Sequence, residues 1–386
     1  MKKIFIALLV YLLSACQQVQ SPRYAPSASL PPYQFAKFAD YRQATADWLQ
    51  QHRLPVTRNA DWEVTLNTPF SCGEQFNKGV MLVHGLGDSP YFFHDVARDL
   101  CQAGYQVRTI LLPGHGSKPG DMLQADYATW QEVTNYQVAQ FARDVDTLVL
   151  GGFSTGANLV TLTAANRDDI AGLVLFSPAF QPDFFVTRLA PYATALYPWP
   201  NLEDEDNPTR YNSIAMQGFS AYQQSVTALS DTLEARRLSV PVFMVVAEKD
   251  SVVNVDKVAD AFHSRFTGKP KTMMWLGEQP PSYPGVTGYT MQLPQQRIGA
   301  ASHMAVLFDP GNVLYGTKGS LRICDNGQSD SKTEACKRGE VVWYGPWGYT
   351  EEDKVFARLT YNPYYPTMLS QIQGFLKQVV AQHTDQ

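Results

Sequence analysis

Residues 148–159 of the chain are LVLGGFSTGANL. The apolar run at the start predicts a buried strand, and the apolar spacing from Ala157 onward predicts a helix. Between them, the letters GFSTG fit the pattern G-x-S-x-G, whose small residues let the backbone turn sharply from strand to helix. Such a turn would present the hydroxyl of Ser154 at the edge of a sheet. Ser154 is therefore a candidate nucleophile; the alternative is an incidental glycine-rich turn.

Similar apolar runs, separated by helical patterns, recur along the chain. They predict strands at residues 80–83, 107–112, 148–150, 173–176, 242–246 and 272–276. Helical spacing predicts helices at residues 92–103, 158–165 and 255–266. Continuous apolar strands that alternate with helices indicate a parallel sheet covered on both faces, so we expect a fold of the α/β class.

Composition narrows the class of protein. Of the 386 residues, 45% are hydrophobic and 17% are charged, which excludes a disordered, collagen-like or coiled-coil chain. The formal net charge is −5, so no basic excess is available to neutralise phosphates and nucleic acid is not an expected partner. No cluster of Cys or His has the spacing of a zinc site, and we expect no metal.

Two further motifs follow predicted strands, VHGLG at residues 83–87 and LPGHG at residues 112–116. Together with GFSTG they resemble the α/β-hydrolases, closest to the bacterial carboxylesterase, monoacylglycerol lipase and lysophospholipase branch with a cap domain. The resemblance covers residues 78–180 and 241–303. It implies a mostly parallel central sheet with helices on both faces and an inserted cap, and a reaction that needs no cofactor.

The resemblance also implies roles for the loops. The backbone N–H groups of Leu86 and Thr155 would bind the substrate oxyanion. The ring of His84 would support its loop, and LPGHG would shape the loop beside the nucleophile.

In this fold the catalytic groups follow the order Ser, acid, His along the chain. Asp250, just after the strand predicted at residues 242–246, is the expected acid, and Glu248 and Asp256 are the fallbacks. A carboxylate at this place would orient the imidazole of the base and stabilise its protonated form.

His303 lies beyond the last predicted strand, where the family carries its general base. His263 is on a predicted helix and His383 is in a polar tail, so we expect neither to react. Residues 277–302 are rich in Pro, Gly and Gln, and the path of the chain to His303 stays open.

Residues 179–238 lack the strand pattern and are predicted to form the cap. Its aromatic side chains would either bury an acyl chain or form the core of the cap: Phe180, Phe184, Phe185, Tyr192, Tyr197 and Trp199. We expect a serine hydrolase that cleaves short to medium acyl esters, monoacylglycerols or lysophospholipids through an acyl-enzyme. One alternative is a prolyl-aminopeptidase-like serine peptidase, marked by a substrate-binding carboxylate within residues 203–206. The other is a non-catalytic envelope-binding lipoprotein on the same fold.

The N-terminus has the pattern of an export signal over residues 1–15, with a positive start and a short apolar run. Its end, Leu13-Ser14-Ala15-Cys16, resembles the bacterial lipobox, which implies that Cys16 is acylated, with palmitate, and anchors the protein in a membrane. Gln17 resembles the pattern of outer-membrane lipoproteins. We therefore expect a lipid-anchored protein of the bacterial cell envelope, with residues 16–32 as a flexible tether; the alternative is an ordinary secretory signal.

Outside the cytoplasm, the other four cysteines are expected to form disulfides. Cys324 and Cys336 bracket a short polar stretch and would form a local bridge, which leaves Cys72 with Cys101; buried free thiols are the alternative. The folded part would then comprise a first core segment, the cap and a second core segment with an insertion of unassigned role. The first core segment would span residues 33–178, the cap residues 179–238 and the second core segment residues 239–386, with the insertion at about residues 310–349.

Overall fold

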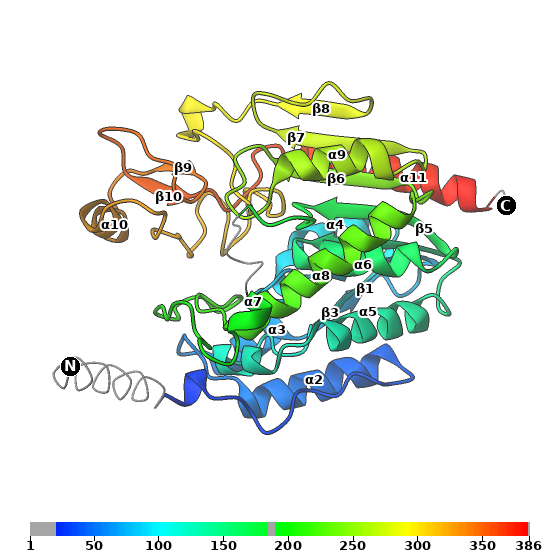
Figure 1. Ribbon diagram of the computed structural model, residues 1–386, viewed down its shortest axis with the longest axis horizontal. Coiled ribbons are helices and arrows are strands. Elements are labelled where there is room, and N and C mark those ends of the chain that lie inside the picture. Colours follow the sequence, from blue (N-terminus) through cyan, green and yellow to red (C-terminus); the bar gives the residue numbers. More distant parts are fainter. Residues whose placement is uncertain (1–20, 184–189, 385–386) are drawn as a thin grey trace, which may run out of the picture.

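An eight-stranded sheet forms the centre of the computed structural model, which describes residues 21–183 and 190–384 (Figure 1). The strand order is β1-β3-β2-β4-β5-β6-β7-β8. β1 runs antiparallel to β3, and the other neighbours are parallel. The strands are β1 (Ser71–Cys72), β2 (Lys78–Val83), β3 (Gln106–Ile110), β4 (Thr147–Phe153), β5 (Ile170–Phe176), β6 (Val242–Ala247), β7 (Lys271–Leu276) and β8 (Val286–Tyr289). The α/β class is confirmed, and every predicted strand is present.

Helices cover both faces of the sheet. α5, α6, α8 and α9 share one buried apolar cluster with it, and α4 and α11 share the other. The helices are α2 (Phe38–His52), α3 (Ala60–Asn67), α4 (His94–Gln102), α5 (Tyr127–Phe141), α6 (Thr155–Ala165), α7 (Ala190–Ala193), α8 (Met216–Ala235), α9 (Val255–Arg265), α10 (Asp330–Lys337) and α11 (Tyr365–Thr384). Short 3-10 helices are η1 (Pro22–Tyr24), η2 (Pro90–Phe93), η3 (Pro119–Gln124) and η5 (Pro294–Gln296). The predicted helices correspond to η2 with α4, to α6 and to α9.

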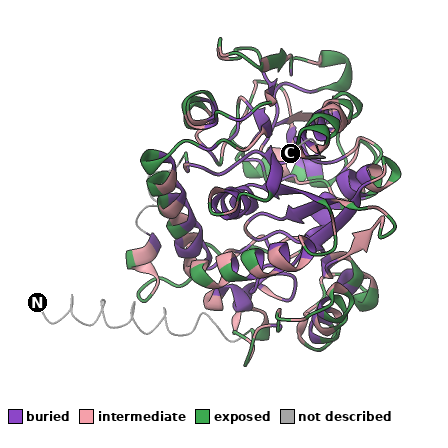
Figure 2. Ribbon diagram, turned by 90° about the vertical axis from the view of Figure 1, so that its right-hand side faces the viewer, coloured by how far each residue is buried: buried purple, intermediate pink, exposed green. Residues whose placement is uncertain are grey.

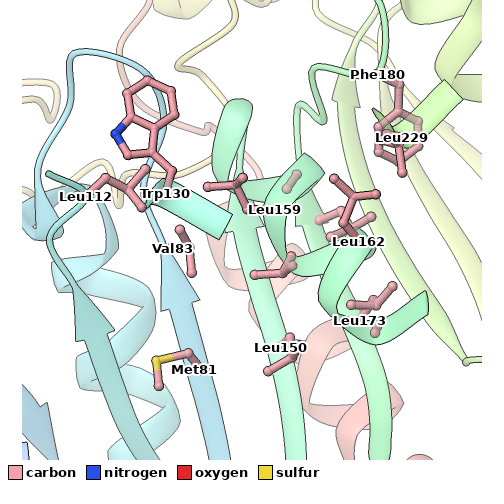
Figure 3. Close-up of a cluster of buried hydrophobic side chains, with 14 of the residues drawn as sticks. Met81, Val83, Leu112, Trp130, Leu150, Leu159, Leu162, Leu173, Phe180 and Leu229 are labelled. Carbon is pink, nitrogen blue, oxygen red and sulfur yellow. The ribbon is translucent and has the colours of Figure 1, made fainter. Parts of the chain in front are cut away.

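Alternate residues of each central strand point to opposite faces of the sheet. In β2, Met81 and Val83 belong to the cluster with α5 and α6, whereas Val80 and Leu82 belong to the cluster with α4 and α11. Figure 2 shows the sheet as the buried middle layer, and Figure 3 shows the first cluster, where Trp130 lies among strand and helix side chains. Burial of both faces fixes the strands, and with them the loops at their carboxyl ends.

β8 is a strand that the sequence did not predict, and it explains the long interval before His303. The chain leaves β7, adds β8 parallel to it at the edge of the sheet, and then returns toward the sheet centre. β8 has the sequence Val-Thr-Gly-Tyr and is partly exposed along its length. An edge strand needs no continuous apolar run, which is why the pattern that marks interior strands is missing here.

Residues 21–32 differ from the flexible tether predicted for residues 16–32. The guanidinium of Arg23 donates to the carbonyl oxygen of Leu54 (2.9 Å), and the N–H and Oγ of Ser27 donate to the carboxylate of Asp121 (2.6 and 3.1 Å). A polar composition indicated a solvated segment, but these polar groups hydrogen-bond to the domain instead. The predicted signal peptide and Cys16 lie outside the described residues. Within the described ranges, no helix combines the length and apolar character that crossing a bilayer requires.

The predicted cap contains α7 and α8, and α8 packs along α6. Phe180 and Trp199 are buried in the same apolar cluster as α6, so these two aromatic residues belong to the core. Of the other aromatic residues that the sequence singled out, Tyr192 and Tyr197 are exposed, and Phe184 and Phe185 lie outside the described residues.

The insertion predicted at about residues 310–349 forms a small unit beside the sheet. It contains α10 and β9 (Trp343–Gly345), which pairs in parallel with β10 (Phe356–Arg358). Both expected disulfides are present: one joins Cys324 to Cys336 in this unit, and one joins Cys72 to Cys101. In Figure 1 the unit lies at the same end of the molecule as α7, toward which the parallel strands point.

Candidate active site

Ser154 occupies the sharp turn between β4 and α6. Its backbone has φ 54° and ψ −118°, a conformation that residues with a side chain rarely adopt. The N–H of Ser154 donates to the carbonyl oxygen of Phe176 (3.0 Å), and its own carbonyl oxygen accepts from the N–H of Ala157 (3.0 Å). These bonds hold the turn at the carboxyl end of β4, above the N-terminus of α6.

Two glycines permit this turn. A methyl group at Gly152 would lie 2.5 Å from the backbone nitrogen of Ala157, and one at Gly156 would lie 2.5 Å from the carbonyl oxygen of His84. Both distances are far below van der Waals contact, so a side chain would force α6 away from the turn or from the loop after β2. The glycines of GFSTG are therefore required by close backbone packing around Ser154.

His303 and Asp250 form a hydrogen-bonded pair. Nδ1 of His303 lies 2.6 Å from Oδ2 of Asp250, whose Oδ1 accepts from the N–H groups of Val252 (2.8 Å) and Val253 (3.2 Å). The carboxylate side chain is fully buried, and the imidazole is 12% exposed. When Nδ1 donates to the carboxylate, Nε2 of the neutral ring is left as an acceptor. The predicted acid and base thus lie together in the arrangement that a general base requires.

His84 supports the loop that follows β2. Its Nε2 accepts from the N–H of Leu112 (3.1 Å), and its Nδ1 donates to the carbonyl oxygen of Gly85 (2.8 Å). Burial lowers the pKa of His84 to about 4, so the ring is neutral near pH 7. Both ring nitrogens are occupied, as expected of a residue that positions the loop carrying Leu86.

The LPGHG segment packs behind this loop. The ring of His115 meets that of His84 edge-on with centroids 4.9 Å apart, and the indole N–H of Trp130 donates to the carbonyl oxygen of Pro113 (2.8 Å). His115 is buried, so it lies behind the loop and away from solvent.

A cavity of about 420 Å³ joins the candidate residues. Ser154, Thr155, Leu86 and His303 line it, whereas Asp250 lies behind His303. Much of the remaining wall is apolar: Phe153, Pro182, Ile214, Phe219, Tyr222 and Met304. The segment predicted as the cap therefore contributes one wall, but through side chains other than the aromatic residues that the sequence singled out.

Three charged residues that the sequence analysis missed also line this cavity: Asp88, Arg210 and Arg358. Burial raises the pKa of Asp88 to about 7, although the charges of Arg210 and His303 act in the opposite direction. Burial, together with the charge of Arg210, lowers the pKa of Arg358 to about 10. Asp88 directly follows the VHGLG motif, which is a signal that could have found it. The two arginines lie in segments without a recognisable pattern.

The fallback residues lie elsewhere. Glu248 accepts a hydrogen bond from Nε1 of Trp275 (3.1 Å), and Asp256 is exposed in the first turn of α9. His263 is exposed on α9, and His383 is in the last turn of α11. Across residues 21–183 and 190–384, no three His, Cys, Asp or Glu side chains are grouped so as to hold a metal ion.

Part of this chain is similar in sequence to known proteins. A family model described as "Serine aminopeptidase, S33" matches residues 74–278, which include Ser154 and Asp250. A thermostable monoacylglycerol lipase from Bacillus sp. (strain H-257) is 30% identical over 101 residues, which are 26% of this chain and 40% of the lipase. The match therefore spans less than half the length of that relative.

Solved structures with a similar arrangement include two monoacylglycerol lipases. The enzyme from Paleococcus ferrophilus gives a TM-score of 0.44 at 20% identity, over 61% of this chain and 89% of that protein. A soluble variant of the monoglyceride lipase from Saccharomyces cerevisiae gives a TM-score of 0.45 at 15% identity, over 54% of this chain and 80% of that protein.

Proposed function

Because this chain belongs to the serine aminopeptidase S33 family of α/β-hydrolases, we propose that it is a serine hydrolase that cleaves carboxylic esters through an acyl-enzyme. The observation that carries the proposal is the 2.6 Å contact between His303 and Asp250 beside the cavity that Ser154 lines. A nucleophile, a base and an acid that orients the base are the groups that acyl transfer needs.

In the proposed reaction, Oγ of Ser154 attacks the ester carbonyl carbon while Nε2 of His303 takes the hydroxyl proton. The carboxylate of Asp250 keeps the proton on Nδ1 and stabilises the imidazolium that forms. His303 then gives its proton to the leaving alcohol, and the acyl group stays on Ser154. Water, activated by the same imidazole, releases the acid and restores the hydroxyl.

The negative charge on the carbonyl oxygen would be held by the backbone N–H groups of Leu86 and Thr155. Both residues line the cavity with Ser154, at the loop after β2 and at the first residue of α6. A fixed donor of this kind contributes about 2.7–4 kcal/mol to lowering the barrier.

Ester cleavage is favoured over an aminopeptidase reaction by the charges around the site. The acidic residues Glu203, Asp204 and Asp206 line a different cavity from the one that contains Ser154. In the site cavity, two guanidinium groups outnumber the single carboxyl of Asp88, which disfavours a substrate ammonium group. Comparison of aminoacyl arylamides with acyl esters tests this choice, and faster arylamide cleavage would favour the peptidase.

The apolar walls of the cavity support an acyl chain as the group that enters it. We propose short to medium acyl esters, including monoacylglycerols and lysophospholipids, as the substrate class. The experiment is to measure turnover of p-nitrophenyl esters of increasing chain length by the wild type and by Ser154→Ala. Ser251→Ala, which removes another hydroxyl from the same cavity, is the matched control. Turnover should disappear only in Ser154→Ala, and full turnover by that variant would refute the proposal.

We further propose that the protein is lipid-anchored through Cys16 in the bacterial envelope, at the outer membrane. The lipobox-like residues 13–16 and two disulfides, which persist in oxidising compartments, support this placement. The full chain, expressed in a Gram-negative host with an alkyne analogue of palmitate, should be labelled and fractionate with the outer membrane. Cys16→Ser should lose the label, and an unlabelled wild type would contradict the proposal.

A further inference from the structure

Two arginines line the site cavity without a carboxylate partner. Arg210 comes from the segment between α7 and α8, and Arg358 is the last residue of β10. Within the part of the chain that the structure describes, neither guanidinium lies at ion-pair distance from an Asp or Glu. By contrast, the buried side chain of Arg53 pairs with Glu63 at 2.6 Å.

The contacts that the two guanidinium groups do make are with neutral acceptors. Arg210 lies 3.5 Å from the carbonyl oxygen of Tyr211 and 3.5 Å from Sδ of Met304. Arg358 lies 3.4 Å from the side-chain oxygen of Asn326 and 3.0 Å from a backbone carbonyl oxygen of the neighbouring loop. Because each guanidinium carries five N–H donors, several donors stay available and the charge is not neutralised.

The two like charges also act on each other. The charge of Arg210 is among the causes that lower the pKa of Arg358. Holding two cations near one another in a partly buried wall costs free energy unless an anion joins them. The charges of Asp325 and Glu203 act on Arg358 in the opposite direction, but no ion pair forms with either of them. Asp88 lines the same cavity, but its pKa is raised to about 7, so it is only partly ionised near neutral pH and cannot balance both groups.

The two arginines lie between the site cavity and a second cavity. Arg210 and Arg358 line both the cavity with Ser154 and a neighbouring cavity of about 540 Å³. Polar and charged side chains of both signs line the second cavity: Glu203, Asp204, Asp206, Arg322, Asp325 and Lys337. A group bound between the arginines would thus face the reacting atoms on one side and polar space on the other.

We propose that Arg210 and Arg358 together bind an oxyanion, phosphate or carboxylate, that the ester substrate carries close to its scissile bond. This inference rests on the proposed function and narrows its substrate class to anionic esters. Planar guanidinium forks match the paired oxygens of both anions. The second cavity leaves room for a polar group beyond the anion, as in the head group of a lysophospholipid.

The test uses three esters of one octanoyl chain, short enough to stay monomeric: monooctanoylglycerol, its glycerol 3-phosphate counterpart, and the octanoyl ester of glycolic acid. The wild type should show a kcat/KM at least about tenfold higher for one or both anionic esters than for the neutral one. In Arg210→Gln and Arg358→Gln this ratio should fall by about 10- to 100-fold, as for loss of a hydrogen bond to a charged group. The anionic ester whose kcat/KM falls toward that of the neutral ester in these variants shows whether the arginines bind phosphate or carboxylate.

Arg143→Gln is the matched control, because Arg143 is exposed and lines neither cavity. Its ratio should equal that of the wild type. A wild type that prefers the neutral ester, or a ratio that both cavity variants leave unchanged, would overturn the inference.

If the arginine variants do not fold, a measurement on the wild type alone still tests the inference. Octyl phosphate should inhibit cleavage of the neutral ester at least about tenfold more strongly than octanol does, and equal inhibition would count against the inference. If none of the esters is cleaved, the proposed function fails instead. Calorimetric binding of octyl phosphate to the intact chain then still decides whether the anion site exists.

Discussion

Nδ1 of His303 lies 2.6 Å from Oδ2 of Asp250, although 53 residues separate them along the chain. Asp250 follows β6, and His303 is reached only after the chain has added β8 to the edge of the sheet and returned. Because β7 lies between β6 and β8, the contact depends on the return of the chain from β8 toward the sheet centre. There Oγ of Ser177, the residue after β5, donates to the carbonyl oxygen of His303 (3.2 Å).

Replacing Asp250 by Asn should lower kcat by about 10³- to 10⁴-fold. The amide keeps the shape of the carboxylate but cannot hold the proton on Nδ1 or stabilise the imidazolium. Glu248→Gln, a change of the same chemistry on the same loop, should change kcat by less than about threefold. Steady-state kinetics on a p-nitrophenyl ester check both, and equal losses in the two variants would speak against Asp250 as the acid.

Gly156→Ala should destabilise the protein by at least about 2–3 kcal/mol and abolish activity. Its methyl group would overlap backbone atoms of the loop after β2. Gly374→Ala is the matched control, since Gly374 lies in α11 with no atom within 4 Å of the added methyl group. That change should raise the unfolding free energy by about 0.5–1 kcal/mol. Urea denaturation measures both, and a stable, active Gly156→Ala would contradict the packing argument.

The stability cost of replacing His84 should depend on pH. Burial lowers its pKa from 6.5 to about 4, so between these values the unfolded chain binds a proton that the folded chain excludes. The contribution of His84 to the unfolding free energy is therefore complete above about pH 6.5 and is lost as the pH falls toward 4. The destabilisation caused by His84→Gln should shrink by about 2 kcal/mol from pH 7.5 to pH 5. Urea denaturation at the two pH values measures this, and a destabilisation that is equal at both would count against a buried neutral His84.

Removal of the Cys72–Cys101 disulfide should lower the unfolding free energy by about 3–4 kcal/mol on the chain-entropy model, because the bridge closes a loop over a separation of 29 residues. The double variant Cys72→Ala and Cys101→Ala isolates this effect. Removal of the Cys324–Cys336 bridge, with a separation of 12, should cost less, about 3 kcal/mol. Denaturation of the two double variants tests the order, and the reverse order would show that loop length does not govern the effect.

The sequence predicts the interior of this fold well because burial on both faces leaves a strong local pattern. Six apolar runs mark the central strands, and GFSTG marks the turn that holds Ser154. Asp250 could be placed because it follows one of these strands directly. His303 could be placed only by its order along the chain, since residues 277–302 carry no interior pattern.

Features that depend on contacts between distant segments were not predictable. β8 lacks an apolar run because it is an edge strand. The polar residues 21–32 lie against the domain because Asp121 and Leu54 happen to accept their hydrogen bonds. Arg210 and Arg358 meet at the site only through the packing of the small unit that carries β10, and neither lies in a motif.

The central claim is that Ser154 is the nucleophile, and covalent labelling tests it most directly. The wild type is incubated with a fluorophosphonate, digested, and analysed by mass spectrometry. The account predicts one adduct, on the peptide that contains Ser154, formed more slowly in Asp250→Asn and absent in Ser154→Ala. An unlabelled wild type, or a Ser154→Ala variant labelled equally well at another residue, would contradict it.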